Sequence, residues 1–195
     1  MSIFRLLTLH MSKFITTTEI SYIIEKMIKD ADEFIFIITP YLKIHPRLKA
    51  VIEEKLSECK SYFQIIVVCK ESELHYKNPD ELKWLKSLPK LKLFNSFNLH
   101  AKCYLNETHA IITSMNLYDF SQVNNIEFGM VVQKDDTDYN KIVKEVSKIS
   151  AKDIIKEIQL CKLEYQKVNS QIRQSMVTSQ AMADAQVKAA LAGLD

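Results

Sequence analysis

The residues best suited to chemistry in this sequence begin with His100 and Lys102, two positions apart in the segment LHAKCYLNETHAIITSMN. Side chains two positions apart on a strand point to the same face, so an imidazole and an ammonium are expected to project together. Ser114 and Asn116 close the segment, after a second short strand, and can bring a hydroxyl and an amide to the same end of a sheet. The four groups together predict a site that engages a phosphate.

Each group has a defined use at a phosphodiester. Displacement at phosphorus builds negative charge on the equatorial oxygens, and Lys102, Ser114 and Asn116 are donors that can hold those oxygens. A neutral His100 can attack phosphorus and form a covalent intermediate, while Glu127 can orient the ring by accepting a ring N–H. A second histidine across the substrate would protonate the leaving oxygen and later activate water. This chemistry requires no metal and no other cofactor, and the sequence offers no clustered ligand set for a metal.

The segment resembles the HKD motif of the phospholipase D superfamily, HxKxxxxD followed by a Gly/Ser-Ser-x-Asn turn. The ITPYL strand end at residues 38–42 also looks like that fold, and the resemblance covers roughly residues 17–134. By position, it implies a nucleophile at His100, a phosphate-binding lysine at Lys102, later phosphate contacts at Ser114 and Asn116, and a histidine-orienting acid at Glu127.

Two positions depart from the family pattern. Glu107 stands where the motif has aspartate, and Thr113 stands where glycine or serine is usual. The acid is mainly structural in the family, so the extra methylene of Glu107 bears on local packing more than on chemistry. Neither change removes a reacting group, and a competent site is expected.

The chain carries one such motif, whereas the family's active centre uses two. A symmetric homodimer that brings His100 of each chain to a shared cleft is the economical solution. Single-motif members of the superfamily are mostly small nucleases, so the resemblance implies a metal-independent endonuclease acting on DNA or RNA. Tyr41, Tyr104 and Tyr118 can stack on bases, although aromatic residues near strand ends are more often part of a core.

Two alternatives remain open at this stage. One is a lipid hydrolase or transferase of the phospholipase D type. The other is a non-catalytic nucleic-acid-binding module that has kept the phosphate pocket. The sequence does not indicate which polymer is cut, whether cleavage is specific, or which process uses it.

Composition sets the frame for these hypotheses. The 195 residues suffice for one well-packed domain with a helical appendage, and a net charge of +2 gives no bulk cationic field. Only 2 glycines occur, which excludes a glycine-rich phosphate loop, and the 4 cysteines show neither zinc-ligand nor disulfide spacing. This cysteine usage indicates reduced thiols and a cytoplasmic location. No apolar run reaches the length of a membrane span, so a soluble protein without a membrane partner is expected.

The elements that must position the site follow from hydrophobic periodicity. Helical spacing predicts helices over residues 17–31, 46–60 and 79–88, and apolar runs at 33–41 and 62–70 predict buried strands. Short strands are expected at 91–94, 100–105, 110–113 and 126–132. This order predicts an α/β fold with a mixed, largely parallel sheet and helices on both faces.

The remaining segments flank this domain. Residues 1–16 are interpreted as an N-terminal extension, residues 17–150 as the phospholipase D-like domain, and residues 151–195 as a long C-terminal helix. Apolar residues from Ile154 to Ile172 alternate steps of four and three, as in a heptad seam. The helix is therefore expected to pack on the domain or on a second copy, or simply to cover the fold.

Overall fold

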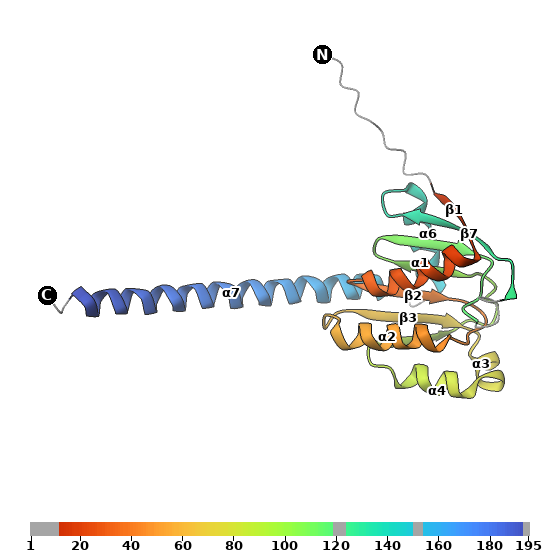
Figure 1. Ribbon diagram of the computed structural model, residues 1–195, viewed down its shortest axis with the longest axis horizontal. Coiled ribbons are helices and arrows are strands. Elements are labelled where there is room, and N and C mark those ends of the chain that lie inside the picture. Colours follow the sequence, from red (N-terminus) through yellow and green to blue (C-terminus); the bar gives the residue numbers. More distant parts are fainter. Residues whose placement is uncertain (1–11, 119–123, 150–153, 193–195) are drawn as a thin grey trace, which may run out of the picture. The chain divides into compact units, whose positions relative to one another are not determined.

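The computed structural model describes residues 12–118, 124–149 and 154–192, which include one seven-stranded sheet ordered β1-β7-β6-β5-β2-β3-β4 (Figure 1). The strands are β1 Lys13–Thr16, β2 Phe34–Ile38, β3 Gln64–Cys69, β4 Leu91–Asn95, β5 Cys103–Asn106, β6 His109–Thr113 and β7 Phe128–Gln133. The helices are α1 Thr17–Asp30, α2 Pro46–Glu58, α3 Glu71–Lys77, α4 Pro79–Ser87, α6 Thr137–Ile149 and α7 Ile154–Ala192.

The sheet is mixed, as expected, and its two halves differ. Strands β2, β3 and β4 pair in parallel and are connected through helices, which is the arrangement predicted from the first half of the sequence. The pairs β2–β5, β5–β6, β6–β7 and β1–β7 are antiparallel. Parallel pairing is therefore confined to one half, because β5 and β6 are joined by a turn too short for a crossover.

Local sequence explains why the central elements form. All five residues of β2 are buried, because the sheet is covered on both faces and its centre never meets water. Helix α1 buries Ile20, Ile24, Met27 and Ile28 on one stripe. Thr16 begins this helix with a capping box in which Glu19 accepts from its backbone N–H.

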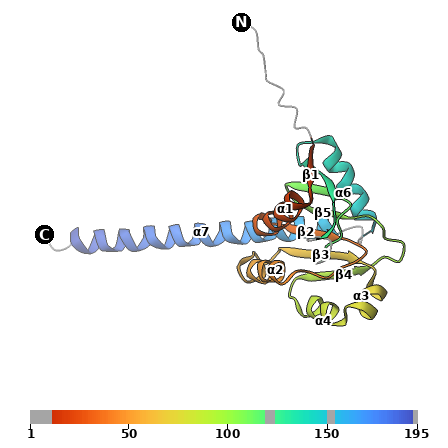
Figure 2. The same cartoon turned by 45° about the vertical axis from the view of Figure 1, so that its right-hand side comes forward.

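The helices cover both faces of the sheet, as Figures 1 and 2 show for α1 and α2 on one side and α6 on the other. The first hydrophobic cluster joins α1, α2 and α4 to inward-facing residues such as Ile35 and Tyr104. The second joins the opposite face, including Phe36 and Cys103, to Tyr139 and Val146 of α6. Alternate residues of one strand therefore enter different cores.

Several boundaries differ from the sequence-based expectation. Residues 13–16, assigned above to the N-terminal extension, form the edge strand β1 on β7. Helix α3 was not anticipated, and β5 begins at Cys103 instead of His100. Residues 1–11 of the expected extension lie outside the described residues.

The helical tail is a unit of its own from Gln159 onwards. Ile158 is buried in the second hydrophobic cluster, whereas Tyr165, Val168 and Ile172 of the expected seam are 38%, 52% and 49% exposed within the chain. Packing of this seam on the domain or on a second copy therefore stays a prediction. In the described part of the chain, no helix has both the length and the apolar character needed to cross a membrane.

Candidate phosphodiester site

One edge of the sheet gathers the ends of five strands. Strand β2 runs parallel to β3 and antiparallel to β5, and β5 runs antiparallel to β6. The carboxyl ends of β2, β3 and β6 therefore meet the amino ends of β5 and β7 at a single edge. Ligands of open α/β sheets bind beyond the carboxyl ends of the strands, so this edge is the expected position of a site.

The predicted site residues lie next to these strand ends. His100 and Lys102 precede β5. The Lys102 carbonyl accepts from the Thr113 N–H at 3.2 Å, so the segment before β5 stays hydrogen-bonded to the end of β6. Ser114 and Asn116 follow β6 directly, and Glu127 precedes β7. The topology thus brings all five residues to the same edge of the sheet.

His100 and Lys102 line a groove of about 430 Å³ between this edge and α6. Ile38, Thr113 and Ile142 are among its other walls. His100 is exposed and Lys102 is half-buried. Within the described residues, neither side chain forms a hydrogen bond or ion pair, so both polar groups are available to a ligand.

Cys103 lines the same groove but is not a competing nucleophile. Its side chain is 7% exposed, and burial raises the pKa of the thiol to about 12. The thiol therefore stays protonated at neutral pH, and the thiolate is the reactive form of cysteine. Of these two groove residues, His100 is the one whose side chain is exposed.

Ser114 and Glu127 form a direct side-chain pair. The Ser114 hydroxyl donates to Glu127 Oε2, and Asn125 Nδ2 donates to Glu127 Oε1 at 3.1 Å. The Phe128 N–H donates to Ser114 Oγ at 3.1 Å, which fixes the hydroxyl further. Glu127 is 6% exposed, so a buried carboxylate holds the hydroxyl in place at the edge.

Asn116 is oriented from the neighbouring strand end. The Thr39 hydroxyl lies 3.2 Å from Asn116 Oδ1 and 3.0 Å from the Tyr41 carbonyl, and these two acceptors share its one proton. The Leu117 N–H approaches the same Thr39 oxygen at 3.4 Å. With the amide oxygen engaged, the Nδ2 group is the part of Asn116 left to donate to a ligand. Thr39 is fully buried and was not singled out from the sequence, where a polar residue ending an apolar strand was the available signal.

Glu107 lies at the opposite end of β5, away from this edge. Its carboxylate accepts from the Asp32 N–H at 2.6 Å, the Glu33 N–H at 3.3 Å and the Phe34 N–H at 3.4 Å. These contacts join the β5–β6 turn to the start of β2. Glutamate at this position therefore performs a structural task, and its extra methylene is accommodated.

The Thr113 hydroxyl also has defined partners. It donates to the Phe128 carbonyl at 2.6 Å and accepts from the Met115 N–H at 3.1 Å. The side chain thereby supports the turn that carries Ser114 and Asn116, and a hydroxyl residue suits this position.

The structure separates some residues that the sequence grouped. Glu127 was expected to accept from the His100 ring, but its partners in this structure are Ser114 and Asn125. Asn116 lines a second cavity and is not among the residues that line the His100 groove. Within the described ranges, no group of three or more His, Cys, Asp or Glu side chains is arranged to hold a metal ion.

Comparison with solved structures identifies the fold. NucT from Helicobacter pylori superposes with a TM-score of 0.58 at 15% identity, covering 71% of this chain and 94% of that one. Nuc from Salmonella typhimurium, a phospholipase D family member, gives 0.56 at 12% identity and covers 71% and 93%. Phosphatidylserine synthase from Haemophilus influenzae gives 0.52 at 13% identity, with 83% of this chain matched to 47% of that one.

These similarities define the class of fold, which is phospholipase D-like. No protein-family model matches the sequence, and no curated protein matches it either. At identities of 12–15%, the shared property is the fold.

Proposed function

We propose that this chain is a phosphodiesterase that cleaves nucleic acid through a covalent phosphohistidine at a site shared by two chains. The observation that supports the proposal most is the exposed imidazole of His100 beside Lys102, which has no side-chain partner among the described residues. It lies at the sheet edge that also carries Ser114, Asn116 and Glu127. The phospholipase D-like fold is consistent with this chemistry.

In the proposed first step, a ring nitrogen of His100 attacks phosphorus and a P–N bond forms. The bond from phosphorus to the leaving oxygen breaks, and that oxygen takes a proton from His100 of the partner subunit. Lys102 and Asn116 donate to the non-bridging oxygens while charge builds on them. In the second step, water attacks phosphorus, its proton goes to that second imidazole, and the P–N bond breaks.

Ser114 and Glu127 act by positioning in this scheme. The Ser114 hydroxyl has one proton and donates it to Glu127, so the donors left for the phosphate in this state are Lys102 and Asn116. We keep the orienting role of Glu127 towards His100 within the proposal. In the assembled dimer with substrate bound, a hydrogen bond from the His100 ring to Glu127 would replace the bond that Glu127 now accepts from Ser114 or Asn125.

The first experiment compares wild type with His100→Ala on single- and double-stranded DNA, on RNA and on phospholipid vesicles, all in EDTA. His109→Ala is the matched control, because His109 lies at the amino end of β6, away from the site. We expect EDTA-resistant nucleic-acid cleavage that only His100→Ala abolishes. Equal cleavage by all three proteins would refute the assignment, and cleavage of phospholipid alone would establish the lipid alternative.

A second experiment tests whether the site is shared. Wild type and His100→Ala are mixed in equal amounts under conditions that allow subunit exchange. If each centre needs two His100 residues, random pairing leaves about one quarter of the centres active, whereas independent sites leave about one half. A sedimentation mass of one chain at the assay concentration would also contradict the shared site.

A further inference from the structure

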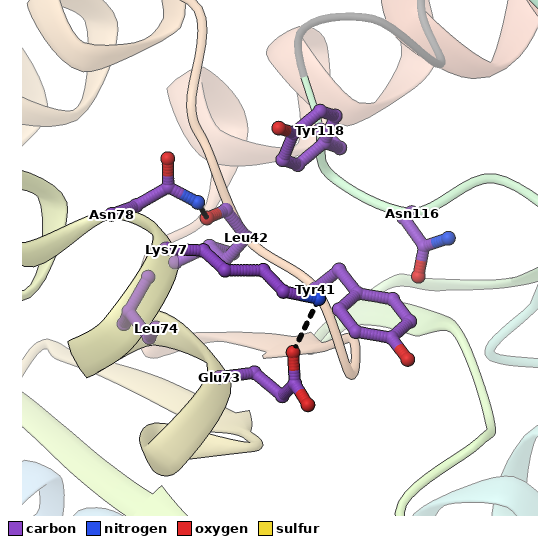
Figure 3. A pocket seen from close by; sticks show the side chains of 8 residues that line it. All are labelled: Tyr41, Leu42, Glu73, Leu74, Lys77, Asn78, Asn116 and Tyr118. Carbon is purple, nitrogen blue, oxygen red and sulfur yellow. Dashed lines mark hydrogen bonds and ion pairs between the residues drawn. The ribbon is translucent and has the colours of Figure 1, made fainter.

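A second cavity, of about 240 Å³, lies at the same sheet edge. Figure 3 shows Asn116 at one side of it and Lys77 and Asn78 of the α3 region at the other, with Tyr41 between them and Tyr118 nearby. Asn116 is the residue shared with the proposed phosphate site. If Asn116 holds the phosphate as proposed, a group bound in the cavity would be next to that phosphate.

The walls of the cavity suit a flat ring. Tyr41 and Tyr118 supply aromatic surface, and Leu42 and Leu74 supply apolar surface. The volume lies below the range typical of pockets for drug-sized ligands, so a single ring system is the appropriate scale. Tyr104, a third tyrosine considered from the sequence, is fully buried and hydrogen-bonded to the Met115 carbonyl, so it is not available for stacking.

The polar groups of the cavity can form hydrogen bonds with the edge of such a ring. Asn78 Nδ2 lies 3.5 Å from the Leu42 carbonyl, which leaves the Asn78 amide oxygen as an acceptor. Glu73 adds a carboxylate that is paired with Lys77 at 2.7 Å. An unpaired nucleobase has N–H donors at its edge and a π-face for stacking. Hydrogen-bond acceptors next to aromatic side chains therefore match both of its features.

The charges disfavour the cationic head group of a phospholipid. Lys77 Nζ lies 5.5 Å and Lys70 Nζ 5.8 Å from the centre of the Tyr41 ring, so ammonium groups already occupy the surroundings of this aromatic face. The hydrogen bond to Glu73 raises the pKa of Lys77, which keeps its charge in place. Choline or ethanolamine would meet like charge here, whereas the phosphates flanking a base would be attracted.

We infer that this cavity binds one unpaired nucleobase, that of a nucleotide flanking the scissile phosphate, with Tyr41 as the stacking residue. The inference rests on the proposed function, because the phosphate at Asn116 sets which base can enter. Such a cavity selects single-stranded or locally opened nucleic acid, since a base inside a duplex stack cannot enter a pocket of this kind.

Binding tests this inference without depending on cleavage. Fluorescence anisotropy compares a short single-stranded oligonucleotide with the same strand in which abasic nucleotides replace the bases, in wild type, Tyr41→Ala, Tyr41→Phe and Tyr76→Ala. Tyr76 is the matched control, because it is an 84% exposed tyrosine of α3 that does not line the cavity. The loss of one stacked base costs about 1–3 kcal/mol, which is a roughly 5- to 150-fold change in Kd.

We expect Tyr41→Ala to weaken binding of the base-bearing strand by about tenfold or more, within that range, and to narrow the gap between base-bearing and abasic strands. Tyr41→Phe, which keeps the ring, and Tyr76→Ala should bind like wild type. If Tyr41→Ala lost the same affinity for the base-bearing and the abasic strand, or lost none for either, the inference that the cavity binds a base would be wrong. A protein that shows the tyrosine-dependent preference but never cleaves would instead overturn the proposed nuclease function.

Discussion

Removal of the Glu107 carboxylate tests whether this departure from the family motif serves the fold or the chemistry. The side chain is 9% exposed and accepts from three successive backbone N–H groups at the start of β2. Glu107→Ala leaves these donors without their partner in a segment that supports the central strand. The fold is therefore expected to lose stability, while the distant sheet edge keeps its reacting groups.

The size of the effect follows from the three contacts. The bond from the Asp32 N–H is short and charge-assisted, and such bonds contribute about 1.5–3 kcal/mol. The bonds from Glu33 and Phe34 are longer, at 3.3 and 3.4 Å, and add smaller amounts. Glu107→Ala should therefore lower the free energy of unfolding by about 3 kcal/mol. Glu107→Gln keeps an acceptor and should cost about 1 kcal/mol.

Urea unfolding followed by tryptophan fluorescence measures these losses. Trp84 is the only tryptophan, and it packs against the first hydrophobic cluster, so its emission reports the domain and not the helical tail. With a slope of about 2 kcal/mol per molar urea, Glu107→Ala should shift the midpoint down by roughly 1.5 M. Glu54→Ala, which removes an exposed carboxylate of α2, should stay within about 0.5 kcal/mol of wild type.

The refuting result is specific. If Glu107→Ala unfolds at the wild-type urea concentration but cleavage of a phosphodiester is lost, then the carboxylate acts in the reaction and its contacts at β2 are incidental. If the Ala variant is too unstable to assay, Glu107→Gln below its unfolding transition decides the same question, and we expect it to keep its turnover rate.

Three further substitutions probe the surroundings of the site. Gly129→Ala would place a Cβ 3.0 Å from the Ile112 carbonyl oxygen, so urea unfolding should show a loss of about 1–2 kcal/mol; equal or greater stability would contradict this close approach. Tyr104→Phe leaves the buried Met115 carbonyl without its donor, and calorimetry should detect a loss of about 1–2 kcal/mol, whereas an unchanged Tm would mean that the bond contributes nothing. Burial raises the Cys103 pKa from 9.0 to about 12, so the unfolded chain binds fewer protons than the folded chain between these values and stability falls as pH rises. In unfolding measured from pH 9 to 11, Cys103→Val should reduce the slope of the unfolding free energy against pH by up to about 1.4 kcal/mol per pH unit. Parallel curves for wild type and variant would exclude the thiol as a cause.

Much of the domain follows from local sequence. The apolar runs that became β2 and β3 are recognisable because strands covered on both faces must be apolar throughout. Helix α1 could be predicted for a related reason, since the apolar residues on the buried face of a helix recur every three or four positions. The pairing of His100 with Lys102 was predicted from strand alternation at a spacing of two, but both residues precede β5, so the groove that they share depends on the tertiary structure.

The elements that were missed depend on distant partners. The four residues of β1 carry no strong pattern of their own, and they form a strand because β7 offers an edge to pair with. The balance of parallel and antiparallel pairs was also set by which strands became neighbours. Sequence spacing limits those neighbours where a turn is short, but it does not choose them elsewhere.

At the site, the sequence by itself determined which chemical groups are present, and the tertiary structure decided their partners. Tyr104 lies within β5 and is fully buried, while Tyr41 and Tyr118 lie beyond strand ends and line a cavity. Glu127 bonds to Ser114 because β6 and β7 pair in one particular register. Local spacing decides which face a side chain takes, but its burial and contacts come from residues far away in the chain.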